Sequence, residues 1–162
     1  MIPYQINEAQ LQIGEDWEDQ SLQVFKLPSA PAGKPASFVV SRDLSRKDHE
    51  SFSAYVLKQK EQLNAKLPSL KLLKEENIHY QDHEGAWLEY SWSNGESELY
   101  IRQVFYDRFP LSLIFTLSCI SADSQYFAET WRRTMSATVL APKVQLAESA
   151  PFPPPEAIVR KG

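Results

Sequence analysis

The sequence predicts an α+β fold in which an antiparallel β-sheet meander carries two α-helices. Most of the chain alternates apolar and polar residues with a period of two, as strands do. Two separate segments instead repeat their apolar residues every three or four positions, as amphipathic helices do. In addition, Asn94-Gly95 lies between two alternating segments and predicts a tight hairpin.

The first elements are short strands. Residues 2–13 alternate loosely and predict one or two strands, which end in the acidic turn GEDWEDQ. Trp17 of this turn is expected to pack inward. The next alternating stretch, SLQVFKL, predicts a strand with Leu22 and Val24 on one face.

A loop and a further strand lead to the first helix. PSAPAGKPA is too rich in proline and glycine for regular structure, and SFVVSRD then predicts a strand. Ser45 or Asp48 is expected to cap the helix, and Pro68 to stop it. Its apolar stripe has spacings of three and four and consists of Phe52, Val56, Gln59, Leu63 and Leu67.

The second half of the chain predicts four more strands and a helix. The strands are LKLLKEENIHY, AWLEYSW, ELYIRQVFYDRF and LSLIFTLSCI. The second helix covers about residues 123–137 and directs Trp131 toward the sheet. Two helices are expected to cover only one face of such a sheet. The apolar residues of the other face therefore need further cover, from loops, a second copy or a bound client.

The predicted folded part ends before the last twenty or so residues. We expect residues 1–140 to form a single domain, because 162 residues suit one compact core. Residues 141–162 are proline-rich and predict a flexible tail outside that core.

Composition argues against several classes of partner. The net charge is −4 and the lysines and arginines are scattered, so no basic stripe is available for nucleic acid. Cys119 is the single cysteine and the N-terminus lacks the pattern of a signal peptide, which predicts a cytoplasmic protein. The most apolar segment, residues 109–120, is shorter than the roughly 20 residues that span a bilayer. We therefore expect no direct membrane insertion.

The residues that could carry chemistry are isolated. His79 and His83 fall at a strand end and in a turn, so we expect surface histidines, like His49, rather than a zinc site. Cys119 faces the expected core without a base beside it. Phosphate-binding glycine loops and a nucleophile elbow are missing from the sequence. The sequence thus predicts no enzyme, no catalytic residue, no cofactor and no metal.

Two glutamines interrupt apolar faces. Gln103 shares a strand face with Leu99 and Ile101, and Gln59 lies in the middle of the first helix's stripe. A buried amide without a partner costs about 1–3 kcal/mol. Both side chains therefore need partners, either in the fold or in a ligand.

The order of these segments resembles a known family. YQINEAQLQI, EDWEDQSLQVF, SFVVSRD before a long amphipathic helix, and AWLEYSW before the hairpin into ELYIRQVF are similar to the DcrB-like family. Within that family the chain resembles the Eag-type chaperones of the bacterial type VI secretion system, over residues 1–140. The resemblance implies a Mog1/PsbP-like fold, a homodimer and a non-enzymatic task.

The resemblance also implies a client and a groove. The client would be the N-terminal transmembrane region of a type VI effector, of PAAR or Rhs type, which is later loaded onto the secretion spike. A generic protein-binding module of Mog1-like fold, without a membrane-protein client, is the alternative. By position, the resemblance implies a client-binding groove formed by Leu22, Val24, Gln59, Leu67, Leu99, Ile101 and Gln103.

Overall fold

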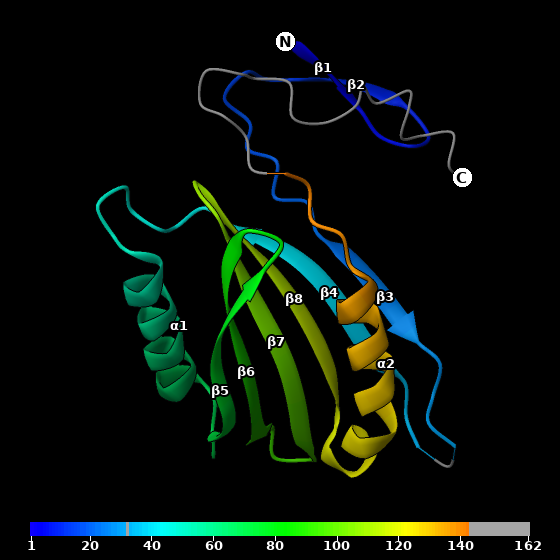
Figure 1. Ribbon diagram of the computed structural model, residues 1–162. Coiled ribbons are helices and arrows are strands. Elements are labelled where there is room, and N and C mark those ends of the chain that lie inside the picture. Colours follow the sequence, from blue (N-terminus) through cyan, green and yellow to red (C-terminus); the bar gives the residue numbers. More distant parts are fainter. Residues whose placement is uncertain (32, 143–162) are drawn as a thin grey trace. The chain divides into compact units, whose positions relative to one another are not determined.

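The computed structural model describes residues 1–31 and 33–142, which belong to two compact units (Figure 1). The larger unit comprises residues 21–139. The smaller one contains residues 1–20 and, of the described C-terminal residues, 140–142. Whether residues 1–140 behave as a single domain stays a prediction, and most of the predicted tail lies outside the described residues.

The N-terminal unit contains a two-stranded hairpin. β1 (Ile2–Gln5) pairs antiparallel with β2 (Gln10–Ile13), as the loose alternation predicted. The prediction that Trp17 packs inward is wrong, because this side chain is 64% exposed. Its ring lies against Gly14, which has no side chain to enclose it.

The larger unit contains one antiparallel sheet of six strands, in the order β3-β4-β8-β7-β6-β5. Strands β5 to β8 form a continuous meander, and β4 adds to β8. This confirms the expected α+β fold, in which an antiparallel meander carries two helices. The strands are β3 (Gln23–Leu27), β4 (Ala36–Asp43), β5 (Lys71–Tyr80), β6 (His83–Ser93), β7 (Glu98–Arg108) and β8 (Leu111–Ile120).

The predicted Asn-Gly hairpin is confirmed between β6 and β7. Gly95 has a φ of 94°, a left-handed value that glycine adopts without steric cost. The side-chain oxygen of Asn94 accepts hydrogen bonds from the N–H groups of Glu96 and Ser97, both at 2.9 Å. These bonds satisfy the turn backbone and fix the register of the two strands.

The first helix, α1 (Phe52–Lys66), begins later than the sequence predicted. Ser51 is the N-cap, and its hydroxyl accepts a hydrogen bond from the Ala54 N–H at 3.1 Å. A cap at Ser45 or Asp48 is therefore wrong. The cap stands directly before Phe52, the first helical residue that enters the core, so packing decides where the helix starts.

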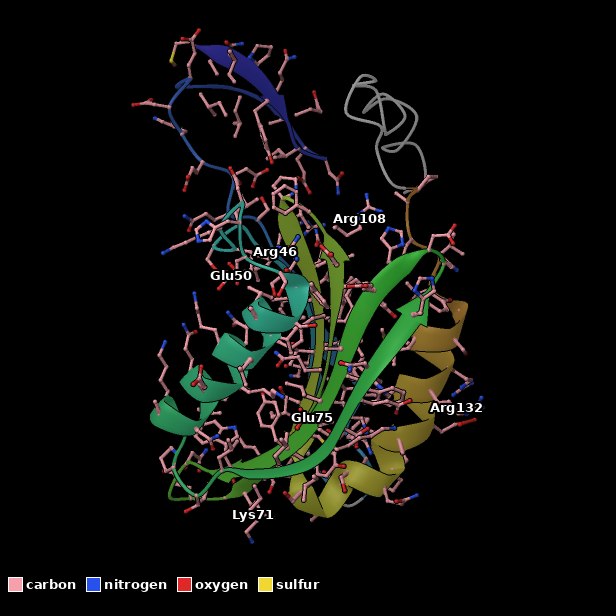
Figure 2. The ribbon with its side chains drawn as sticks, turned by 60° about the vertical axis from the view of Figure 1, so that its left-hand side comes forward. Arg46, Glu50, Lys71, Glu75, Arg108 and Arg132 are labelled. Atoms are coloured by element: carbon pink, nitrogen blue, oxygen red, sulfur yellow. The ribbon has the colours of Figure 1, made fainter. Side chains whose placement is uncertain are left out.

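The two helices cover opposite faces of the sheet, which corrects the expectation that both cover one face (Figure 1). Leu88 of β6 belongs to the core cluster beneath α1. The preceding residue, Trp87, has its ring 6.3 Å from that of Trp131 on α2 (Ser124–Ala137). Successive strand residues point to opposite faces, so each helix has a face of its own. Figure 2 shows the same arrangement in a second view.

One histidine is not at the surface as predicted. His83 is buried at the start of β6, whereas His49 and His79 are exposed. Its Nδ1 lies 2.7 Å from the Gln81 carbonyl oxygen, and its Nε2 lies 3.1 Å from Arg108 Nη1. Because arginine can only donate, Nε2 accepts and Nδ1–H donates. The ring is thus a structural link between the turn and β7.

Candidate functional site

One row of residues crosses the sheet on the face that carries α1, here called the α1 face. The strand register aligns, from β3 to β6, Val24, Val39, Thr116, Gln103 and Leu88. Residues directly opposite each other in a sheet point to the same side. The row therefore joins the core beneath α1 to the edge strand β3.

Burial decreases along this row toward β3. Leu88 is fully buried beneath α1, while Val39 and Thr116 are half-buried. Val24 is 61% exposed, and Leu22, which precedes β3, is 52% exposed. We call the five residues Leu22, Val24, Val39, Thr116 and Gln103 the open strip.

The position of α1 explains why the strip is open. The Phe52, Tyr55 and Val56 side chains pack on β6, β7 and the start of β8. Lys60 of α1 forms an ion pair with Glu75 of β5, which Figure 2 labels, so the helix is tied to the β5 side of the sheet. The half of the α1 face that belongs to β3, β4 and β8 is left with less cover.

Hydroxyl groups accompany the apolar side chains of the open strip. Ser37 and Ser41 alternate with Val39 on β4, and Ser118 lies opposite Ser37 on β8. All three serines are half-buried. This part of the α1 face can therefore offer both aliphatic contact and hydrogen bonds to a bound group.

Gln103 already has partners in the fold. Its Nε2 donates to Thr116 Oγ1 at 3.0 Å, and its Oε1 accepts from the Tyr90 hydroxyl at 3.4 Å. Burial raises the pKa of Tyr90 to about 12, so the phenol stays a donor at neutral pH. An amide has two N–H donors and two acceptor positions. One N–H donor and one acceptor position of the Gln103 amide therefore remain for a ligand, although the amide already has two partners in the fold.

Gln59 is in a different position. It is half-buried on α1, one turn after Val56, and no residue in the described chain accepts from or donates to its side-chain amide. Both ends of this amide are therefore available to solvent or to a ligand.

The other predicted site residues lie closer to the core. Leu67 and Leu99 are half-buried and pack against the cluster beneath α1. Ile101 is buried within that cluster, so a ligand cannot reach it while α1 is in place. Of the seven predicted residues, only Leu22 and Val24 are strongly exposed.

Sequence reasoning missed Val39 and Thr116. Both residues alternate correctly in their strands, and nothing local distinguishes them from core residues. Their place in the open strip depends on the pairing of β4 with β8, which are far apart in the chain.

The opposite face holds a paired charge cluster. Glu89 accepts hydrogen bonds from the Trp87 indole N–H at 2.9 Å and from the Tyr100 hydroxyl. Arg102 Nε lies 3.7 Å from the same carboxylate. Burial, together with the bond to Glu89, raises the pKa of Tyr100 to about 12. These groups therefore pair with one another on the face of the sheet that carries α2.

Within residues 1–31 and 33–142, no three His, Cys, Asp or Glu side chains gather at a distance that would hold a metal ion. The helices of this described part are too short or too polar to span a bilayer.

Comparison with known proteins identifies one family. The DcrB family model matches residues 8–137. A curated protein from Pseudomonas aeruginosa, named Effector EagT6, is 39% identical over 142 residues, which are 88% of this chain and 98% of that protein.

Solved structures resemble this chain to different degrees. A P. aeruginosa protein of unknown function, PA94, superposes with a TM-score of 0.77 at 39% identity and covers 88% of this chain and 98% of its own. The cyanobacterial PsbP of Synechocystis gives a TM-score of 0.48 at 10% identity, over 78% of this chain and 96% of its own. LpqN of Mycobacterium tuberculosis gives 0.48 at 12% identity, over 72% and 82%. Because the family model spans most of the chain, and a relative with well over a third of identical residues matches nearly end to end, this protein belongs to the DcrB family.

Proposed function

We propose that this protein is a cytoplasmic chaperone that holds the N-terminal transmembrane helices of a type VI secretion effector until the effector is loaded onto the secretion spike. The observation that carries the proposal is the open strip, where Leu22 and Val24 are exposed beside a well-packed core. The similarity to EagT6 over nearly the whole chain supports it.

The apolar residues would supply most of the binding free energy. A transmembrane helix of about 20 residues exposes roughly a thousand Å² or more of apolar surface in water, at about 25 cal/mol per Å². Contact with Leu22, Val24 and Val39 would remove part of that surface from water. Because one side of the strip stays open, binding remains reversible, as transfer to the secretion machine requires.

The amides and hydroxyls would orient the client. Transmembrane helices often carry small residues, which leave backbone carbonyls and hydroxyls accessible. Gln103 has one N–H and one acceptor position left, and the Gln59 amide has no partner in the described chain. Hydrogen bonds from these two side chains would select one register of the client helix.

The proposed partners follow from this task. The client is an effector of PAAR or Rhs type. The chaperone contacts the spike protein only indirectly, through this effector. It acts as a homodimer and catalyses no reaction. The presence of exposed apolar residues on both faces of β3 supports the dimer, because Val24 and the neighbouring Phe25 are both exposed.

A second candidate is a generic protein-binding module without a membrane-protein client. The half-buried hydroxyls of Ser37, Ser41 and Ser118 favour it, because they would also suit a polar extended segment. The two functions differ in whether an apolar segment of the client is required.

Co-purification with an effector fragment tests the proposal. Val24→Asp should abolish retention of a fragment that contains the N-terminal apolar segments, because it places a charge where apolar surface must dock. Gln59→Ala should weaken retention with little change in melting temperature. Leu57→Asp is the matched control, since Leu57 is 54% exposed on α1 outside the apolar stripe. Full retention by a folded Val24→Asp variant would refute the assignment, and equal retention of a fragment without its apolar segments would favour the generic module.

A further inference from the structure

The N-terminal unit presents an apolar face next to an exposed tryptophan. The register of β1 and β2 places four apolar side chains on one face of the hairpin, here called the N-terminal apolar face: Ile2, Tyr4, Leu11 and Ile13. Ile2 and Leu11 are each 42% exposed. Trp17, which is 64% exposed, follows β2 after a short turn. A two-stranded hairpin is marginally stable by itself, so further chain that covers such a face would stabilise it.

Contacts within this unit hold the turn of Trp17 against both strands. The Trp17 N–H donates to the Gly14 carbonyl oxygen at 3.2 Å. The indole also lies so close to Gly14 that a Cβ atom there would come within 2.7 Å of its nitrogen. The Tyr4 hydroxyl of β1 donates to Asp19, two residues after Trp17. The unit therefore carries two aromatic rings in one small region, and rings of this kind line the grooves that bind proline-rich segments.

The same turn is strongly acidic. Trp17 is flanked by four exposed carboxylates: Glu15, Asp16, Glu18 and Asp19. The first twenty residues contain five Asp or Glu residues and no lysine or arginine. A segment that combines prolines and apolar residues with positive charge would therefore complement this surface.

The C-terminal segment of this chain has that composition. PFPPPEAIVRK, residues 151–161, contains four prolines and ends with Arg160 and Lys161. Proline-rich segments favour the extended polyproline II helix, which loses little conformational entropy when it binds an aromatic surface. This segment follows residue 137, where the family match ends, and it lies outside the described residues.

We propose that residues 151–161 bind the N-terminal unit of the same chain, with the proline run against Trp17 and with Arg160 and Lys161 beside the carboxylates of the turn. The surface differs from the open strip and shares no residue with it, so the inference goes beyond the proposed function. The bound segment would exclude proline-rich segments of other proteins from Trp17.

The length of the chain permits this contact. The described chain ends at residue 142, in the same compact unit as residues 1–20. Residues 143–150 can span about 25 Å when extended, whereas each four-residue strand of the hairpin is about 13 Å long. A short tether gives an effective concentration of about 1 mM, so a segment with an intrinsic Kd of about 0.1 mM would be bound about nine-tenths of the time.

Fluorine NMR of the full chain labelled with 5-fluorotryptophan tests the contact. The four tryptophans give four resonances, and Trp17→Phe identifies that of Trp17. Replacing Pro153, Pro154 and Pro155 together by alanine should shift the Trp17 resonance and leave the other three in place. Pro31→Ala is the matched control, because Pro31 is an exposed proline of the larger unit. An unchanged Trp17 resonance in the triple variant, or an equal shift in the control, would overturn the proposal.

Charge reversal provides an independent measurement. Arg160→Glu with Lys161→Glu should move the Trp17 resonance to the position of the triple proline variant, because like charges then oppose each other. Adding Glu15→Lys and Asp16→Lys to that chain should restore the wild-type position. A chain that is not restored would contradict the pairing of these charges.

Dilution distinguishes contact within one chain from contact between two copies. The Trp17 resonance of the wild-type chain should keep its position between about 200 μM and about 5 μM, because an intramolecular contact does not depend on protein concentration. A resonance that moves on dilution to the position of the triple proline variant would mean that the segment of a second copy occupies the surface, which would overturn the proposal.

Discussion

The hydrogen bond between Gln103 and Thr116 allows a quantitative test of how the open strip is organised. Replacing Gln103 by Leu removes the donor of the 3.0 Å bond to Thr116 Oγ1 and the acceptor of the 3.4 Å contact from Tyr90. Thr116→Val removes the other partner of the shorter bond while keeping the shape of the side chain. If the bond forms in the free protein, the two changes remove the same interaction.

The expected magnitude follows from burial and geometry. A hydrogen bond of this kind contributes about 0.5–1.5 kcal/mol net to stability. Gln103 and Thr116 are half-buried, so water replaces part of the lost interaction. We expect each single change to lower the free energy of unfolding by about 1 kcal/mol, and the double change to lower it by a similar amount rather than by the sum. The coupling energy is then about 1 kcal/mol.

Urea denaturation of the four chains measures this coupling, provided that their m-values agree. The control cycle combines Gln103→Leu with Ser118→Ala, because Ser118 lies on the same face of β8 but opposite Ile101. That pair should be additive within about 0.3–0.5 kcal/mol. A Gln103–Thr116 coupling no larger than the control would mean that this hydrogen bond does not form in the free protein, and would refute the idea that Thr116 occupies one N–H donor of the amide.

Three further predictions concern the core. Leu88→Ala should lower the free energy of unfolding by about 2–5 kcal/mol in urea titrations, because Leu88 is fully buried under α1, and a loss below 1 kcal/mol would contradict that packing. Tyr55→Phe removes the 2.6 Å bond to Asp43 and should cost about 1.5–3 kcal/mol at pH 7. Burial alone favours the neutral acid, yet the hydrogen bonds from Tyr55 and Ser45 lower the pKa of Asp43 below its ordinary 3.8. This stabilisation is present above pH 3.8 and is lost as pH falls through the folded pKa, so the difference in stability between Tyr55→Phe and wild type should shrink as pH falls below 3.8. A difference that grows there would be inconsistent with this bond. Burial raises the pKa of the Cys119 thiol to about 11, so alkylation by iodoacetamide at pH 7.5 should follow unfolding, and rapid labelling of the native chain would show that the thiol is accessible.

Local periodicity was sufficient to predict the elements themselves. The strands from Glu98 to Arg108 and from Leu111 to Ile120, and the hairpin at Asn94-Gly95, were predicted because alternation and turn chemistry involve only neighbouring residues. The shared face of Leu99, Ile101 and Gln103 follows from the same period of two. The family resemblance, carried by short segments in a fixed order, was confirmed by the DcrB family match.

Tertiary structure decided which residues are reachable and what they contact. Whether Ile101 is buried, whether His83 lies inside and which face each helix covers all depend on packing between segments that are distant in the chain. The partner of Gln103 is the clearest case: Thr116 is thirteen residues away, and it reaches the amide because β7 and β8 pair in one register. A shift of that register by one residue would turn Thr116 to the opposite face, since successive strand residues point to opposite sides, and no pattern within either strand alone specifies which register forms.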